Sequence, residues 1–343
     1  MTLNDNFTNN TVIEQGKISV TGEKTLTNNG TITADIENAG TIITDADKIS
    51  GSVKNSNKMI LTGGTADETI SEDSFAKLGS DVTGEGTTVI DGYVNAADKK
   101  LETAVEIKDD KGLYIKADGL KKAVANEGGL YLADGTLAQK VTGSGITAIR
   151  GNVEIGAEIS QSNIVVETGS LTTNADLIKG GLINNETVNF TGGTLEDRYL
   201  SIGGTTNFKG KTAFSNTVSL ANSTVNFYLD GFKAGDTIVT SDKTAALNNA
   251  EIGLYQVIDT EHKLTQKGDK ITLISSAEGY GYTEEAPNLI DVQGGMVEDT
   301  YGVYQSTTGA LEAAYIESGL IDQTKSFSEA RLAGSAAINE GSD

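Results

Sequence analysis

An eleven-residue phrase occurs twice in this chain. Residues 82–92 (VTGEGTTVIDG) return as residues 141–151 (VTGSGITAIRG), and seven of the eleven positions are identical. The copies lie 59 residues apart, close to three units of about 20 residues, a period typical of solenoids. The repeat therefore predicts a stack of coils. In that register Val89 and Ile149 should face the same column of the core, three coils apart.

Short runs between the repeated phrases alternate apolar and polar residues. Residues 17–20, 187–190 and 224–227 are clear examples. Alternation with a period of two puts one face of a strand inward and the other outward. Gly, Asn and Asp between the runs supply tight corners. We expect short strands over roughly residues 10–230, with ten or eleven coils and a rod about 50 Å long.

Composition narrows the classes of partner. The 343 residues include 48 acidic and 26 basic ones, for a net charge of −22. Nucleic acid is an unsuitable partner, because phosphate binding needs a basic surface. No cysteine is present, so disulfide and thiol chemistry are excluded. The first residues lack the apolar core of an export signal, and no apolar stretch is long enough to span a membrane as a helix.

The pattern changes along the chain and predicts three regions. Residues 1–230 form the β-helix, with longer loops over residues 66–140 and one helical turn at residues 120–125. Residues 231–307, where tyrosine becomes frequent, form a cap on the open end of the stack. Residues 308–343 end in a helix from about Asp322, where Ser326 and Glu329 have the spacing of a capping box.

The chain resembles the passenger domains of bacterial autotransporters, the type V secretion system. The Asn/Gly/Thr coils carry the resemblance loosely, and residues 323–334 (QTKSFSEARLAG) with 339–343 (NEGSD) carry it more specifically. These last segments look like the junction to the outer-membrane β-barrel. The resemblance implies a secreted right-handed parallel β-helix at the cell surface, an autochaperone-like region over residues 231–307, and a helical linker to the protein's own barrel.

Catalytic and cofactor signals are weak. His262 is the only histidine, and a catalytic triad would need a nucleophile motif beside it, so an exposed loop imidazole is the better interpretation. Residues 143–148 fit a dinucleotide fingerprint, but that fingerprint must open a helix. Here a strand-like pattern follows, and the earlier copy at Gly84 and Gly86 indicates a repeat corner.

Metal and carbohydrate-cleaving sites are equally unsupported. Asp109–Asp110 and Glu284–Glu285 are acidic pairs, which are usually solvated surface. Asp91 and Arg150 occupy equivalent positions in the two phrases, and three coils would separate them by about 14 Å on one face, too far to cooperate. The coils hold no Trp and few aromatic residues for sugar stacking. We therefore predict no catalytic, cofactor-binding or metal-binding residues.

These features favour a non-catalytic passenger that acts as an adhesin or a surface structural rod. Binding would use the Thr/Asn/Asp face or a loop near residues 66–140. A host-surface ligand, an extracellular-matrix ligand or a neighbouring passenger would be its partner. Two alternatives stay open: a polysaccharide-cleaving β-helix enzyme, because the fold hosts many activities, and an intracellular or phage-associated solenoid.

Overall fold

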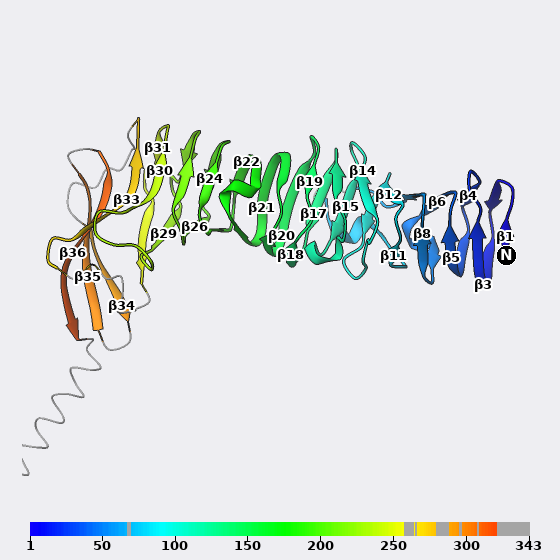
Figure 1. The fold of residues 1–343 in the computed structure, drawn as a ribbon, viewed down its shortest axis with the longest axis horizontal. Coiled ribbons are helices and arrows are strands. Elements are labelled where there is room, and N and C mark those ends of the chain that lie inside the picture. The colour runs from blue at the N-terminus through cyan, green and yellow to red at the C-terminus, as the bar shows by residue number, and fades with distance from the viewer. Residues whose placement is uncertain are drawn as a thin grey trace, which may run out of the picture.

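The computed structural model describes residues 1–66, 70–256, 264, 266–278, 288–294, 297–306 and 309–320. In them the chain is an all-β parallel solenoid of about 12 turns, drawn in Figure 1 as a rod with the N-terminal strands at one end. Stacked at about 4.8 Å per turn, 12 turns measure roughly 58 Å. The predicted parallel coil stack is confirmed.

Three sides make up each turn, and each strand pairs in parallel with the strand one turn away. The first side consists of β1 (Thr2–Leu3), the ends of β3 (Val12–Val20) and β5 (Thr31–Asn38), β8 (Val53–Asn55), β11 (Val82–Thr83), β18 (Gly135–Leu137), β23 (Thr187–Phe190), β26 (Thr205–Phe208), β29 (Thr224–Tyr228) and β32 (Glu251–Tyr255). The second side consists of β2 (Phe7–Asn9), β4 (Thr25–Asn28), β6 (Thr41–Asp45), β9 (Lys58–Thr62), β12 (Thr87–Ile90), β14 (Ala104–Ile107), β16 (Val124–Asn126), β19 (Val141–Thr142), β24 (Gly193–Leu195), β27 (Thr212–Phe214), β30 (Thr237–Ser241) and β33 (Lys270–Ser276).

The third side carries the groove described below. It consists of the starts of β3 and β5, then β7 (Ile49–Ser50), β10 (Ala76–Lys77), β13 (Tyr93–Asn95), β15 (Gly112–Ile115), β17 (Gly129–Leu132), β25 (Tyr199–Ser201), β28 (Val218–Ser219) and β31 (Ala245–Ala246). Long strands bend around corners and serve more than one side: β20 (Ile146–Ile155), β21 (Ile159–Thr173) and β22 (Ile178–Asn184).

Short 3-10 turns occupy some corners. They are η1 (Ala46–Lys48), η2 (Glu72–Ser74), η3 (Ala117–Gly119) and η4 (Ala175–Leu177). The helical turn predicted at residues 120–125 is wrong, because that segment pairs with its neighbouring turns instead. Lys121 donates its N–H to the carbonyl of Leu101, and Val124 donates to that of Lys140.

Apolar side chains from all three sides fill the inside of the rod. Along the second side, for example, Ile42 and Met59 are stacked in register and fully buried. Toward the C-terminal end the stack becomes aromatic. The ring centroids of Phe190 and Phe208 are 5.7 Å apart, and those of Phe208 and Phe227 are 5.5 Å apart. Each fully buried side chain of this size stabilises the fold by about 1.5–3 kcal/mol.

Buried asparagines close several corners. The Asn38 side-chain amide donates to Asn55 Oδ1 at 2.8 Å, and Asn38 Oδ1 accepts the N–H of Gly40 at 3.0 Å. Asn9 and Asn28 are linked in the same way at 2.7 Å. These amides satisfy buried polar groups where the chain bends, which removes a cost of about 1–3 kcal/mol per unpaired group.

The turns around the repeated phrase are shorter than the predicted unit of about 20 residues. Val141 stacks on Val124, Val124 on Val105 and Val105 on Thr88. Three turns back from Val141 the chain is therefore at Thr88 on the second side, whereas Val82 lies on the first side. The two copies of the phrase are three turns and one side apart, so they occupy different corners.

The predicted column of Val89 and Ile149 is consequently wrong. Val89 is in register with Glu106 on the second side, whereas Ile149 is in register with Leu132 on the third. Both residues are buried, but they belong to different sides. The solenoid itself rests on the strand pairings and does not depend on this register.

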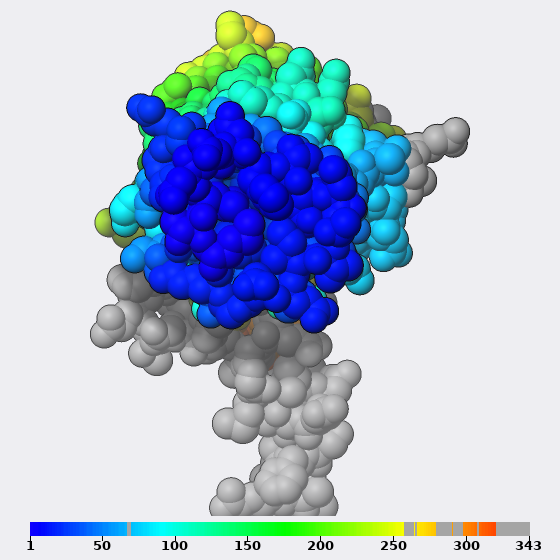
Figure 2. Space-filling view, turned by 90° about the vertical axis from the view of Figure 1, so that its right-hand side faces the viewer, coloured from blue at the N-terminus to red at the C-terminus, as the bar shows by residue number. Residues whose placement is uncertain are grey.

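One turn is much longer than its neighbours on this part of the rod. Thr88 stacks directly on Met59, because a segment after β9 leaves the stack before β11. In the end-on view of Figure 2, light-blue atoms of this part of the chain project from one flank, beside the blue N-terminal turns. The longer loop falls inside residues 66–140, as the sequence predicts.

Parallel stacking continues past residue 230 as far as β33. The order then becomes antiparallel, from β33 to β36 (Leu311–Leu320), β35 (Val297–Gln305) and β34 (Asn288–Gly294). These last three strands lie at the C-terminal end of the rod (Figure 1). The three-region division and the capping role stay predictions. The expected helix from Asp322, including Ser326 and Glu329, lies outside the described residues.

Candidate functional site

Two neighbouring turns repeat a Gly-Leu-Tyr phrase on the third side. Residues 112–115 (GLYI) are in register with residues 129–132 (GLYL), one turn later. Leu113 and Leu130 point into the core and are fully buried. Because side chains alternate along a strand, Tyr114 and Tyr131 point outward from neighbouring positions in the sheet.

Glycine makes room for the rings. A Cβ atom at Gly112 would lie 2.8 Å from Cδ1 of Tyr93 and 3.1 Å from Cε2 of Tyr131. A Cβ atom at Gly129 would lie 2.6 Å from the Tyr131 hydroxyl. The rings of Tyr93 and Tyr131 therefore lie over two glycines, against the backbone of the sheet.

The long loop after β9 packs on the same rings. The Phe75 ring centroid lies 5.2 Å from that of Tyr93 and 5.7 Å from that of Tyr131. Ile70 and Tyr114 pack against this cluster as well. The cluster is separate from the main core, as is usual for apolar residues under a long loop.

Arg150 connects the rings to the loop. Its guanidinium carbon lies 4.5 Å from the Tyr131 ring centroid. Its Nε donates to Glu167 at 2.7 Å, and Nη1 donates to the carbonyl of Ile70 at 2.7 Å. The Arg150 side chain is only 14% exposed. A cation thus lies on a tyrosine face and is paired with a carboxylate, which strengthens both contacts.

A groove lies beside this cluster, which we call the tyrosine groove, with a volume of about 460 Å³. It is lined by Ile70, Tyr93, Asp109, Asp110, Lys111, Glu127, Gly128, Gly129, Tyr131, Ser144, Gly145, Ile146, Ala148, Ser162, Val165 and Glu167. Such a volume is within the range of ligand sites, and the mixture of an apolar floor with polar groups is typical of them.

Ionisation in the groove follows from local contacts. Both the N–H and the hydroxyl of Ser144 donate to Glu127, and these hydrogen bonds lower the pKa of the Glu127 carboxyl. Burial raises the pKa values of Tyr114 and Tyr131. At neutral pH the groove therefore presents the neutral phenol of Tyr131 and the charged carboxylate of Glu127.

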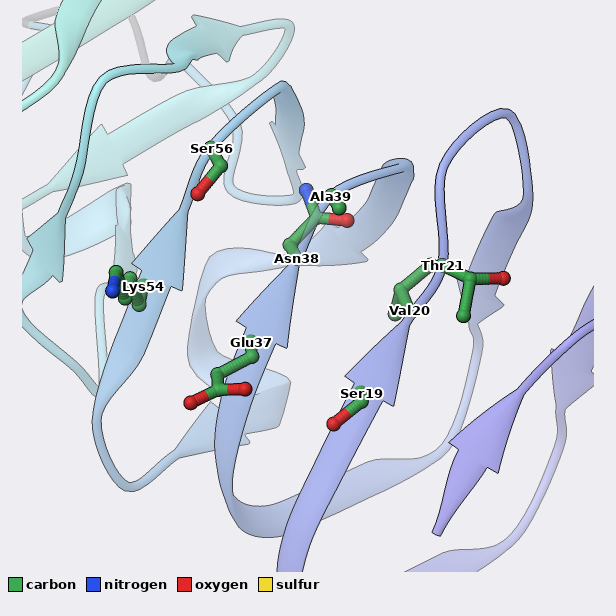
Figure 3. Close-up of a pocket in the computed structure, with 8 residues that line it drawn as sticks. All are labelled: Ser19, Val20, Thr21, Glu37, Asn38, Ala39, Lys54 and Ser56. Carbon is green, nitrogen blue, oxygen red and sulfur yellow. The ribbon is translucent and has the colours of Figure 1, made fainter.

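A second hollow of about 300 Å³ lies on the first side near the N-terminal end. Figure 3 shows Ser19, Glu37 and Lys54 on three successive strands of its wall. Glu37 is already paired with Lys17 at 2.7 Å, and both side chains are more than half exposed. This is ordinary polar solenoid surface, with a smaller volume than the tyrosine groove and no aromatic residue in its lining.

The structure separates some of the residues considered from the sequence. Asp91 follows β12 on the second side, whereas Arg150 follows the third-side stretch of β20, so their predicted placement on one face is wrong. Residues 143–145 form a corner that leads into strand β20 rather than a helix. Asp109 and Asp110 line the tyrosine groove. His262, Glu284 and Glu285 lie outside the described residues.

Metal-ligand clusters and membrane-spanning helices are both absent from the described ranges. No group of three or more His, Cys, Asp or Glu residues there could hold a metal ion. None of the helices in the same ranges has the length and apolar character needed to cross a membrane. The expected lack of cofactor and metal residues in the whole chain stays a prediction.

Sequence reasoning missed the tyrosines that form the groove. Tyr93, Tyr114 and Tyr131 recur at intervals close to the length of a turn. The repeated Gly-Leu-Tyr phrase would have brought them together once the true register was known. The assumed unit of about 20 residues hid this signal. Comparison with known proteins adds nothing to it: no family model, curated protein or solved structure matches the chain.

Proposed function

We propose that this chain is a secreted, surface-exposed and non-catalytic passenger of a bacterial autotransporter, acting as an adhesin or a surface structural rod. The observation that carries the proposal is the parallel stack of about 12 turns. Side chains fill its inside, so a partner is met only on its outer flanks. A stiff rod of this kind holds a binding surface away from the membrane that anchors it.

Two further features support the proposal: the segment at residues 323–334 and the tyrosine groove on the side of the rod. Residues 323–334 resemble the connection to an outer-membrane β-barrel, which would be the chain's own partner during export. The right-handed coil and the helical linker belong to this same proposal. The tyrosine groove is lined by residues of β13, β17, β20 and β21, and the last three of these strands lie in the middle third of the rod (Figure 1). A host-surface or matrix ligand would bind on this side of the rod.

Surface placement is tested on intact cells that express the complete natural reading frame. Antibodies against the rod should label unpermeabilised cells, and added protease should remove the label while a periplasmic marker survives. Purified rod coated on beads should then attach to host cells or matrix. Labelling that requires permeabilisation would overturn the secretion proposal and favour an intracellular solenoid.

Catalysis is tested separately. Incubation with acidic and neutral polysaccharides should release no reducing ends above a boiled-protein blank. Activity that survives repurification would replace the adhesin by a polysaccharide-cleaving enzyme. Activity that His262→Ala abolishes would identify the single histidine as part of its machinery.

A further inference from the structure

The tyrosine groove has more negative than positive charge, and most of the negative charge is not neutralised locally. Asp109, Asp110 and Glu127 take part in no ion pair with any described residue. Some other carboxylates of the coils are paired: Glu85 with Lys122, and Glu158 with Lys140. The groove wall therefore presents three carboxylates without a cationic partner among the described residues.

Apolar residues line the same groove as these carboxylates. The ring of Tyr93 lies over Gly112 and is partly exposed, and Ile146 is 46% exposed. Ala148 and Val165 extend the same surface. A ligand in this groove would meet a ring, aliphatic groups and carboxylates that lack an ion-pair partner among the described residues.

Two lining residues, Tyr131 and Glu167, already bind a cationic side chain of the chain itself. Arg150 places its guanidinium over the ring of Tyr131 and pairs with Glu167. Tyr93 offers a second ring, and no arginine or lysine of the described residues lies over it. Tyr93 and the three carboxylates without an ion pair line the same groove.

We propose that the tyrosine groove binds a lysine or arginine side chain of an extended peptide segment in a protein partner. This inference rests on the proposed function of the rod as a binding surface, and it assigns the site and the ligand class. The cation pairs with Asp109, Asp110 and Glu127 and lies on the Tyr93 ring. The aliphatic stem of the same side chain covers Ile146.

The negative charge of the groove favours a basic side chain over an anionic ligand or a neutral sugar. The lining contains four carboxylates, from Asp109, Asp110, Glu127 and Glu167, against the single ammonium of Lys111. An anionic ligand would be repelled, and a neutral sugar would leave the unpaired charges uncompensated. The net charge of −22 on the whole chain also attracts basic partners over long range.

The test uses the full chain and a fluorescein-labelled peptide, Gly-Ala-Arg-Ala-Lys-Ala-Gly, followed by fluorescence anisotropy. The groove variant is Asp109→Asn/Asp110→Asn/Glu127→Gln. Its matched control, Asp5→Asn/Glu14→Gln/Glu23→Gln, removes the same charge from exposed residues of the first turns that form no ion pair with the described residues. The groove variant should raise Kd at least tenfold and the control less than twofold.

A second pair of variants tests the ring. Tyr93→Leu keeps the apolar volume and removes the ring face, so Kd should rise threefold or more. Tyr255→Leu, at an exposed tyrosine on the far part of the rod, should leave Kd unchanged. Circular dichroism confirms that each variant is folded. A peptide with glutamine in place of arginine and lysine should not bind.

Three outcomes would overturn the proposal. If the two charge variants weaken peptide binding equally, the peptide is attracted only by the overall negative charge of the rod. Absence of binding to the unmodified chain would exclude a basic peptide. Saturable binding of neutral oligosaccharides that the groove variant abolishes would assign the groove to a sugar instead. None of these results affects surface labelling, which tests the proposed function separately.

Discussion

Two buried threonines on different sides of the rod have opposite consequences for stability. Thr88 and Thr147 are both fully buried. The hydroxyls of Thr88 and Thr103 are hydrogen-bonded at 2.6 Å. Thr147 Oγ1, in contrast, has no hydrogen-bond partner in the described part of the chain. An unpaired buried hydroxyl costs about 1–3 kcal/mol.

Thr147→Val should therefore stabilise the protein by about 1 kcal/mol, because valine has the same shape and no hydroxyl. Thr88→Val should destabilise it by a similar amount, since Thr103 would lose its partner. Urea unfolding midpoints of the two variants check this. Destabilisation by Thr147→Val would mean that its hydroxyl has a partner in solution.

The ion pair between Asp45 and Lys48 should weaken in acid. Lys48 contacts its carboxylate at 2.7 Å, and the Thr62 hydroxyl donates to it at 2.6 Å. The hydrogen bond from Lys48, followed by that from Thr62, lowers the pKa of Asp45 below its usual value of 3.8. A lowered pKa in the folded state adds stability above the unfolded pKa, and that contribution is lost as pH falls through the folded value.

Asp45→Asn should accordingly lower the melting temperature at pH 7, by an amount equivalent to less than about 1 kcal/mol for such a partly exposed pair. The difference from the unmodified protein should shrink below the usual carboxyl pKa of 3.8 and vanish at lower pH. Asp47→Asn, which removes an exposed neighbouring charge, should show no such convergence. A difference that stays constant from neutral pH into strong acid would contradict this role of Asp45.

At the scale of elements, the two copies of the repeated phrase share a corner structure but do not occupy equivalent positions in one stacked column. Gly84 and Gly143 both have positive φ, 115° and 122°, and a Cβ atom would lie 2.2 Å from the carbonyl oxygen of Asn55 and Asn126 respectively. Both copies therefore place glycine over an asparagine of the preceding turn. One corner design serves two different corners of the rod.

Gly143→Ala should destabilise the protein by about 2–3 kcal/mol, because alanine meets both an unfavourable φ and a backbone oxygen. Gly16→Ala, where nothing lies within 4 Å of the new Cβ atom, should change stability by no more than about 0.5 kcal/mol. Urea midpoints again provide the comparison. Similar values for the two variants would show that the corner geometry is wrong.

The loop after β9 is held on the flank by Arg150. Arg150→Met should speed amide exchange of Ser74 and Phe75 by at least about tenfold, since charge-assisted hydrogen bonds contribute about 1.5–3 kcal/mol. Arg198→Met is the matched control, because Arg198 is exposed and its side chain donates to Asn163, away from this loop. Unchanged exchange in Arg150→Met would mean that Phe75 packing alone holds the loop.

The parallel stack and its corners could be predicted from the sequence. Alternating apolar and polar residues indicate strands, and glycines indicate corners, and both signals depend only on residues close together in the chain. The register could not, since one long turn, from Met59 to Thr88, and the shorter turns that follow it average close to the assumed unit. The groove was missed for the same reason. Tyr93 and Tyr131 meet only when the length of each turn is known, and Arg150 reaches them from a further turn.

At the scale of the whole molecule, the account depends on one continuous rod whose regular turns are shorter than about 20 residues, the unit expected from the repeat. Arg150 donates to Glu167 across 17 residues of chain, and Ser144 donates to Glu127 across the same interval. Regular turns of about 20 residues would separate these partners and would move Tyr131 away from Tyr114. The register is therefore the central claim, and the proposed binding site depends on it.

Disulfide trapping tests the register most directly, because the chain has no cysteine of its own. Glu37 is in register with Lys54, and Ala125 with Thr142, so their Cα atoms lie about 5 Å apart, within the range that a disulfide spans. Cysteines at each pair should form an intrachain disulfide under mild oxidation, mapped by mass spectrometry. The control pair is Lys122→Cys/Thr142→Cys, which would be in register only if the turn had about 20 residues. This pair should stay reduced. Cross-linking of the control pair without cross-linking of Ala125→Cys/Thr142→Cys would contradict the account.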